Sequence, residues 1–262
     1  MLPEIFHFLP VSHPRYTYLE TASDDWFGDF DGDGIPEIPV GRLPVRTAEE
    51  ARAVVAKIVG YEGGASGGEW TQEVLLVADR NDGFDFEEAT RGLVDLFPAD
   101  RTVRGIFLGE SDPGTARSEL LGSLNAGASL VNYLGHGSVE VWSKGGILTS
   151  RDAPSLTNGP RLPFVVSMNC LNGFFHDLYT ESLGEALLNA EGGGAVAVWA
   201  SSGLTGPEEQ VEMDRALLKA LFGESRPTIG EAIREAKAAV SDGDIRRTWI
   251  LFGDPATRLP SK

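Results

Sequence analysis

Asn132-Tyr-Leu-Gly-His136-Gly137-Ser138 and Phe164-Val-Val-Ser-Met-Asn-Cys170-Leu-Asn-Gly173 are the two stretches that decide the fold. Each begins with an apolar run typical of a buried β-strand and breaks at small, flexible residues. In each, the first reactive side chain stands where the strand should end. Reacting groups collect beyond the carboxyl ends of parallel strands. The pattern therefore predicts an open, mainly parallel sheet with His136 and Cys170 at one edge.

The rest of the chain alternates apolar strands with amphipathic helices, which predicts an α/β sheet covered by helices on both faces. We expect strands at 38–45, 74–78, 103–108, 128–134, 164–168, 194–200 and 248–252. We expect helices at 47–61, 86–97, 115–125, 182–190, 208–222 and 229–240. A Gly-rich connector at 63–68 predicts a boundary between an N-terminal subdomain, residues 1–64, and the main domain, residues 65–262.

The composition narrows the possible partners. The 262 residues carry a formal net charge of −17, which argues against nucleic acid, because phosphate binding depends on Lys and Arg. The single cysteine cannot form an intramolecular disulfide. No apolar run reaches the length of a membrane span. The first residues lack the pattern of a signal peptide, so an exported protein would be represented here by its mature form or by a fragment.

An acidic loop near the N-terminus is a candidate calcium site. Carboxylates alternate along it and a glycine allows a sharp turn, which is the ligand spacing of a calcium loop. The position where an EF-hand has its last ligand holds Val40, and no flanking helices are expected, so the alternative is a plain acidic β-turn. The candidate ligands are Asp29, Asp31, Asp33, Ile35 (through its carbonyl) and Glu37.

Cys170 and His136 are the candidates for chemistry. A free cysteine is most often a small buried apolar residue, but Cys170 follows a strand and precedes a flexible turn. His136 lies between two glycines, which let the backbone approach a substrate closely. A thiol and an imidazole at one rim form a nucleophile and its base. The backbone N–H groups of Cys170 and Gly137 are candidate donors to an oxyanion.

Several blocks, in order along the chain, resemble the gingipain family of cysteine peptidases. The spacing of 34 residues between His136 and Cys170 also fits that family. The matching blocks are Gly135-His136-Gly137-Ser138, Asn169-Cys170-Leu-Asn-Gly173-Phe, Gly194-Ala-Val-Ala-Val198-Trp-Ala-Ser201-Ser, Trp249-Ile-Leu-Phe-Gly253-Asp254-Pro255 and Gly41-Arg42-Leu-Pro-Val45.

The resemblance implies a three-layer caspase-like fold in residues 65–262, with residues 1–64 as the remnant of an N-terminal subdomain. It also implies that Cys170 is the nucleophile and His136 the general acid/base. Asp79, at the end of an earlier strand, stands where the family has an acidic residue that orients the histidine. The alternative for Asp79 is a cap or turn residue.

The resemblance further suggests a substrate pocket. Asp85 is the nearest match to the family's acidic residue for a basic side chain before the cut, although it would also serve as a helix N-cap with Glu88 three residues on. Trp142, Trp199 and Ser201 are candidate wall residues, and for the two tryptophans core packing is the commoner role. The family's wall tryptophan beyond Ser201 is absent here.

These observations predict a cysteine endopeptidase that acts on protein or peptide substrates, with a preference for Arg or Lys before the cut. Two alternatives remain open: a sortase-like transpeptidase using the same two residues, and a calcium-stabilised binding module with a vestigial site. No cofactor is expected for catalysis, and calcium is expected in a structural role. We expect the protein outside a bacterial cell or on its surface.

Overall fold

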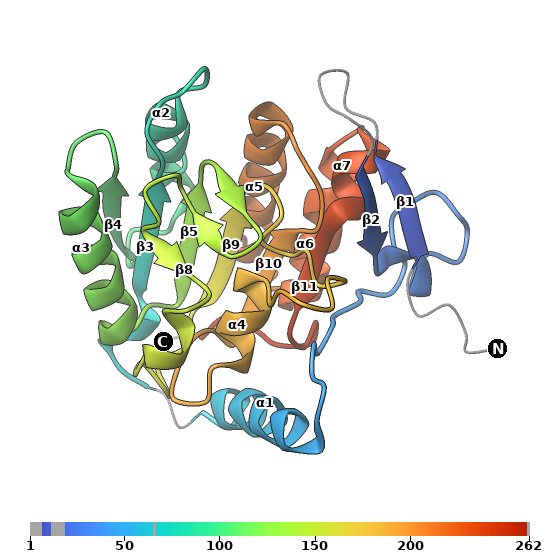
Figure 1. The fold of residues 1–262 in the computed structure, drawn as a ribbon, viewed down its shortest axis with the longest axis horizontal. Helices are drawn as coiled ribbons and strands as arrows, with labels where there is room; N and C mark the ends of the chain where they lie inside the picture. The colour runs from blue at the N-terminus through green and yellow to red at the C-terminus, as the bar shows by residue number, and fades with distance from the viewer. Residues whose placement is uncertain (1–6, 12–18, 65–66, 261–262) are drawn as a thin grey trace.

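A six-stranded sheet forms the centre of the molecule (Figure 1). The computed structural model describes residues 7–11, 19–64 and 67–260. The strand order is β11-β10-β9-β5-β3-β4, and every neighbouring pair is parallel except β10 with β11. The strands are β3 (Glu73–Ala78), β4 (Thr102–Phe107), β5 (Leu130–Leu134), β9 (Phe164–Met168), β10 (Ala197–Ser201) and β11 (Trp249–Phe252).

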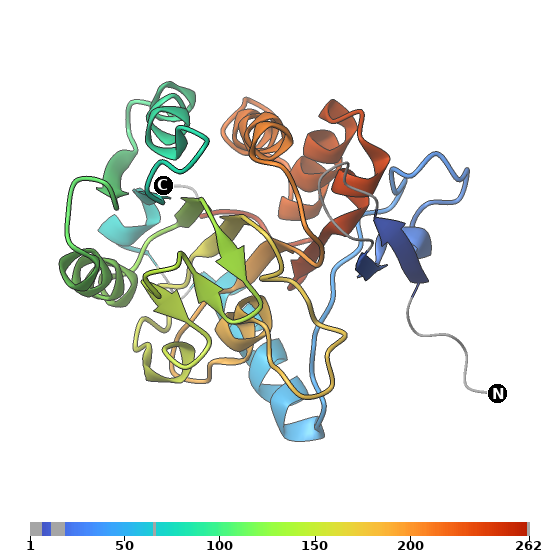
Figure 2. The same cartoon turned by 45° about the horizontal axis from the view of Figure 1, so that its top comes forward.

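Helices cover both faces of the sheet, as Figure 2 shows. On one face lie α2 (Phe86–Arg91), α5 (Pro207–Leu221) and α6 (Ile229–Ala239). On the other lie α3 (Pro113–Ala126) and α4 (Leu183–Asn189), with α1 (Ala48–Glu62) packed against α4. A short helix, α7 (Gly243–Thr248), leads into β11. The expected three-layer α/β architecture with a mainly parallel sheet is confirmed.

The local sequence explains where these helices begin and why the strands are apolar. Thr47, Ser182 and Thr228 each form a capping box at the start of α1, α4 and α6, which satisfies backbone N–H groups that a helix leaves free. Strands β5, β9, β10 and β11 are buried along their whole length. Burial on both faces requires apolar side chains at successive positions, so these strands show no alternation.

Two small sheets were not expected from the sequence. The first is an antiparallel pair, β1 (His7–Val11) and β2 (Leu19–Ser23). The second is formed by β6 (Gly137–Ser138), β7 (Val141–Trp142) and β8 (Leu148–Thr149). It begins directly after His136. Short 3₁₀ helices are at Asp25–Phe27, Glu69–Thr71, Val94–Leu96 and Ala153–Ser155.

Two expected elements were wrong. Residues 38–45 form no strand: Arg42 alone bridges to Phe252, because the prolines of this segment have no N–H to donate to a ladder. The expected helix 86–97 ends at Arg91, where Gly92 forms the C-cap and a separate 3₁₀ turn follows.

The segment before the Gly-rich connector is held against the main domain by polar contacts. The Lys57 ammonium on α1 donates to the carbonyl oxygens of Leu188 (2.6 Å) and Gly193 (2.8 Å). Lys237 of α6 pairs with Asp25 at 2.6 Å in the interior. Residues 65–66 of the connector lie outside the described residues, and the division at residue 64 stays a prediction. No helix in the described part of the chain has the length and apolarity to cross a membrane.

Candidate active site

The two strands that carry His136 and Cys170 are neighbours in the sheet. In the parallel β5–β9 pair, Leu134 lies opposite Met168, and each of these residues ends its strand. His136 and Cys170 each follow two residues later. The amide of Gly135 donates to the carbonyl oxygen of Met168 at 3.2 Å, so the pairing continues past the strand ends. The sheet therefore delivers both segments to one edge at the same level.

The two strand ends are also packed tightly together. Gly137 lies so close to Asn169 that a Cβ at position 137 would be 2.4 Å from Asn169 Nδ2. The side chain of Asn172, in the turn after Cys170, donates to the carbonyl oxygen of Ser138. Asn169 Nδ2 in turn donates to Asn172 Oδ1. Only glycine fits at 137, and the buried amides hold the His136 and Cys170 loops in one arrangement.

The Cys170 thiol is partly buried and donates to a backbone carbonyl. Its Sγ lies 3.6 Å from the carbonyl oxygen of Thr205, in the loop between β10 and α5. Burial raises the pKa of the thiol above its usual value. The next residue, Leu171, has φ of 65°, a left-handed conformation that is costly for a side chain of this size. The resting state is therefore a protonated thiol on a strained turn.

The His136 imidazole is half-exposed, with 46% of its side-chain surface accessible. Its ring packs edge-on against Phe86, with centroids 5.2 Å apart. Its Nε2 lies 3.9 Å from Asp82 Oδ2. Within the described part of the chain, the imidazole and the Cys170 thiol are not hydrogen-bonded to each other.

Asp79 supports the backbone of the histidine loop. It is buried, and its Oδ2 accepts from the backbone N–H of His136 at 3.1 Å and lies 3.3 Å from the Tyr133 hydroxyl. Its Oδ1 accepts from Ser143 Oγ (2.9 Å) and from the N–H of Arg80 (2.8 Å). The Tyr133 hydroxyl also donates to the His136 carbonyl oxygen at 2.7 Å. These contacts are to the peptide groups on both sides of His136 Cα, not to the ring.

A cavity of about 440 Å³ lies beside His136, over the ends of β3 and β4. Neither Cys170 nor Asp85 lines it. Asp85 is exposed and caps α2 by accepting from the N–H of Glu88 at 3.0 Å. The residues that line the cavity are Asp79, Arg80, Asn81, Asp82, Leu108, Pro113, His136, Ser143, Lys144 and Gly145.

The other candidate pocket residues lie in the core. Trp142 has no exposed surface, stacks on Tyr133 at 4.4 Å and donates through Nε1 to Ser167 Oγ. Trp199 is also fully buried and packs against Trp249. Ser201 is buried as well, and its Oγ accepts from the N–H of Gly203. In this arrangement none of the three presents surface to a ligand.

The acidic loop of residues 29–37 brings four of its five candidate ligands close together. Oxygens of Asp29, Asp31, Asp33 and Glu37 all lie within 4.8 Å of one another. Gly34 has φ of 83°, which provides the sharp turn. A set of oxygen ligands from flexible carboxylates suits a hard cation such as Ca²⁺.

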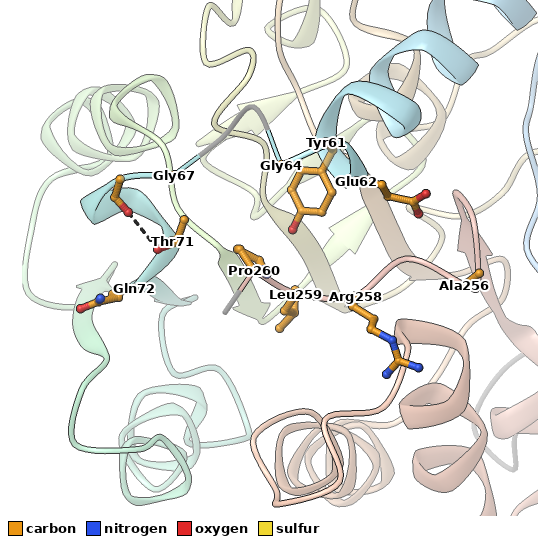
Figure 3. Close-up of a pocket in the computed structure, with 11 residues that line it drawn as sticks. Tyr61, Glu62, Gly64, Gly67, Thr71, Gln72, Ala256, Arg258, Leu259 and Pro260 are labelled. Atoms are coloured by element: carbon orange, nitrogen blue, oxygen red, sulfur yellow. Dashed lines mark hydrogen bonds between the residues drawn. The ribbon is translucent and has the colours of Figure 1, made fainter. Parts of the chain in front are cut away.

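A larger cavity, of about 750 Å³, opens at the opposite end of the sheet (Figure 3). Thr71 and Gln72 line it just before β3 begins, and Tyr61, Leu259 and Pro260 lie across from them. Among the described residues that line it there is no cysteine or histidine.

Three residues at the site were not singled out from the sequence: Asp82, Ser143 and Thr205. Asp82 and Asp85 both belong to the loop between β3 and α2. Only the course of that loop decides which of the two carboxylates faces His136. Ser143 has φ of 63°, and no residue type in its segment predicts that conformation. The Thr205 carbonyl that faces Cys170 belongs to the backbone and leaves no signal in a sequence.

Comparison with known proteins identifies the class. The model of peptidase family C25 matches residues 4–260, and the chain belongs to this family. Gingipain R1 of Porphyromonas gingivalis is 26% identical over 268 residues, which cover 92% of this chain and 26% of that protein. Lys-gingipain W83 of Porphyromonas gingivalis is 24% identical over 73% of this chain and 11% of its own length. The chain thus spans about a quarter of the first relative.

Solved structures agree with the fold. The crystal structure of the Arg-specific cysteine proteinase gingipain R superposes with a TM-score of 0.80 at 23% identity, covering 92% of this chain and 61% of that one. A separase–securin complex from Saccharomyces cerevisiae superposes with a TM-score of 0.51 at 12% identity, over 76% of this chain and 13% of that one. The resemblance to gingipains and the caspase-like fold are confirmed.

Proposed function

We propose that this protein is a cysteine endopeptidase of the gingipain type, with Cys170 as nucleophile and His136 as general acid/base. The observation that carries the proposal is the register of β5 and β9, which brings both residues to one sheet edge at the same level. Membership of family C25 supports the same reaction class.

The reaction proceeds in two halves. His136 takes the thiol proton, the sulfur attacks the scissile carbonyl carbon, and the C–N bond breaks as the imidazolium gives its proton to the leaving amine. His136 then removes a proton from water, the water oxygen attacks the thioester carbon, and the C–S bond breaks to release the acid. The imidazolium returns its proton to the departing sulfur, which restores the thiol. The N–H groups of Cys170 and Gly137 are the proposed donors to the oxyanion.

The resting thiol needs activation in this scheme. Burial raises the pKa of the Cys170 thiol, although hydrogen bonds with Thr205 lower it in part. The sulfur lies 3.6 Å from the Thr205 carbonyl oxygen, so it must turn from Thr205 toward the imidazole before it attacks. Catalytic hydrogen bonds commonly tighten only when substrate binds. Substrate that occupies the space beside Thr205 would favour this change.

The proposed substrates are proteins or peptides with Arg or Lys before the cut. The net charge of −17 favours cationic substrates, and the relatives include proteins named for Arg and Lys. Asp85 stays the proposed partner of the basic side chain, because its carboxylate is exposed and its cap hydrogen bond uses only one oxygen.

Substitution of the nucleophile tests the function. Cys170→Ala should abolish hydrolysis of fluorogenic peptides with Arg or Lys before the cut, while its melting temperature stays close to that of the parent. Because the chain has one cysteine, an alkylating peptide inhibitor followed by mass spectrometry should label the parent at Cys170 and leave the variant unlabelled. Undiminished hydrolysis by Cys170→Ala would refute the proposal. Ligated product in the presence of an added amine would indicate a transpeptidase.

We also propose a structural Ca²⁺ held by Asp29, Asp31, Asp33 and Glu37 with the Ile35 carbonyl. The mutual approach of the four carboxylates supports it. The proposed location is outside a bacterial cell or on its surface, and gingipains of Porphyromonas gingivalis are the relatives that support it.

A further inference from the structure

We propose that Asp82, rather than Asp79, is the carboxylate that orients the His136 imidazole, and that it holds the ring proton on Nε2 so that Nδ1 receives the thiol proton. The inference rests on the proposed function of His136 as general acid/base. It assigns the orienting role to a different residue from the one that the gingipain resemblance implies.

The hydrogen bonds of Asp79 do not involve the His136 ring. Both Asp79 oxygens already accept hydrogen bonds. Oδ1 accepts from the N–H of Arg80 and the Ser143 hydroxyl, and Oδ2 accepts from the N–H of His136. A carboxylate surrounded by backbone and hydroxyl donors fixes the path of the loop. Asp79 therefore positions the His136 Cα and leaves rotation about the side-chain bonds undetermined.

Little else in the sequence restrains the imidazole. Its neighbours in the chain, Gly135 and Gly137, have no side chains that could pack against it. The Phe86 ring packs against it in a T-shaped arrangement, with ring centroids 5.2 Å apart. Among the described residues, Asp82 is the carboxylate within 4 Å of a ring nitrogen, and its Oδ2 lies 3.9 Å from Nε2. A closure of about 1 Å makes this a charge-assisted hydrogen bond.

The position of Asp82 also decides which nitrogen acts as base. A carboxylate facing Nε2 favours the proton there, because the anion accepts from N–H and repels a lone pair. The lone pair is then on Nδ1, the nitrogen that remains for the thiol. When the imidazolium forms during the reaction, Asp82 stabilises its charge.

Lys144 acts on the same carboxylate. Its ammonium lies 3.1 Å from Asp82 Oδ2, the oxygen that faces the imidazole. Lys144 first, and His136 after it, lower the pKa of Asp82, which keeps this group ionised. The side chains of Asp82 and Lys144 are 60% and 84% exposed. The other charged residues that line the cavity beside His136 are Asp79 and Arg80.

Two substitutions separate this role from a structural one. Asp82→Asn and Lys144→Met both remove the Asp82–Lys144 ion pair, so a merely structural pair predicts the same effect for both. An electrostatic role predicts opposite effects on the ring. Loss of the anion makes protonation of His136 harder, and loss of the cation makes it easier.

The measurement is an NMR titration of the His136 ring in the Cys170→Ala protein, assigned by comparison with His136→Gln. Asp82→Asn should move the titration midpoint to lower pH and Lys144→Met to higher pH, each by about 0.2 to 0.7 of a pH unit for exposed pairs. Asp82→Glu should restore most of the shift. Shifts of the same sign, or none in either variant, would overturn the proposal.

The ¹⁵N shifts of the neutral ring provide a second readout. They should show the proton on Nε2 in the parent and a mixed population in Asp82→Asn; a parent ring protonated on Nδ1 would also overturn the proposal. In the active enzyme, Asp82→Asn should lower kcat several-fold with little change in KM. These NMR results do not require turnover, so a failure of the Cys170 test leaves them interpretable, and the two proposals can fail separately.

Discussion

The side-chain amide of Asn132 on β5 donates a hydrogen bond of 2.6 Å to Asp214 Oδ1 on α5, entirely inside the core. Within the described part of the chain, Asp214 Oδ2 and Asn132 Oδ1 have no partner. Burial raises the pKa of Asp214 to about 7. Strand β5, which leads to His136, is therefore joined to α5 through the Asp214 carboxyl group, whose raised pKa favours its neutral form in the folded protein.

This acid makes stability depend on pH. The pKa of Asp214 is about 7 in the folded protein and 3.8 as an isolated group. Between these values the folded state binds the extra proton, so the free energy of unfolding falls as pH rises, by up to about 1.4 kcal/mol per pH unit, and levels off above pH 7. Urea unfolding at several pH values measures this slope.

Asp214→Asn is the matched variant for that measurement, since it keeps a neutral group of the same shape. It should reduce the slope without removing it, because burial also raises the pKa of Glu185 to about 7. An unchanged slope in Asp214→Asn would contradict the assignment.

The buried pair of Lys237 and Asp25 should be costly to break and inexpensive to replace. The ammonium donates to both oxygens of Asp25 and to the carbonyl oxygen of Trp249, with almost no exposure to solvent. Lys237→Met leaves an unpaired buried carboxylate and should lower the free energy of unfolding by about 3–5 kcal/mol. The double variant with Asp25→Leu should recover much of this loss. A single variant as stable as the parent would contradict the pairing.

Gly137→Ala should disturb the site through a steric clash. The added methyl group would lie 2.4 Å from Asn169 Nδ2, next to the nucleophile. We expect a loss of about 1–3 kcal/mol in stability and at least a tenfold loss of peptide hydrolysis. Gly122→Ala in α3 is the control, because a Cβ there meets nothing within 4 Å. It should stabilise the helix by up to about 1 kcal/mol. Equal behaviour of the two variants would refute the close packing.

Removal of calcium should lower the melting temperature. An ion present at about 100 times its dissociation constant adds roughly 2.7 kcal/mol of stability, and a chelator would remove it. The double variant Asp31→Asn with Asp33→Asn should melt at the temperature of the chelated parent and no longer respond to chelator. If the parent does not respond, the loop is a plain acidic turn.

The central sheet could be predicted because its strands, except the edge strand β4, are apolar runs that end at a change of composition. Phe164–Met168 was expected with these bounds, and 74–78 and 128–134 differ from β3 and β5 by no more than two residues at either end. Strands of two residues, such as those of the small sheet after His136, are too short to show a period. Helix α7 has six residues and was missed for the same reason.

The candidate site was predictable only as far as strand ends determine position. The proximity of the His136 and Cys170 loops follows from two neighbouring parallel strands. The direction of the imidazole does not, because it depends on loop residues such as Asp82, whose position no periodicity encodes. Aromatic residues were equally ambiguous: Trp142 stands near the histidine in the sequence, but its ring packs into the core against Tyr133.

The contact between the Cys170 thiol and the Thr205 carbonyl has an evolutionary consequence. Any amino acid at position 205 has the same backbone carbonyl oxygen, so a substitution there does not remove the acceptor of the Cys170 thiol. Only a change in the course of the loop between β10 and α5 can remove it. Selection on how readily the sulfur is released should therefore act on the course of this loop. At position 205 it should act through the hydroxyl, which accepts from Gln210 Nε2 at 2.7 Å.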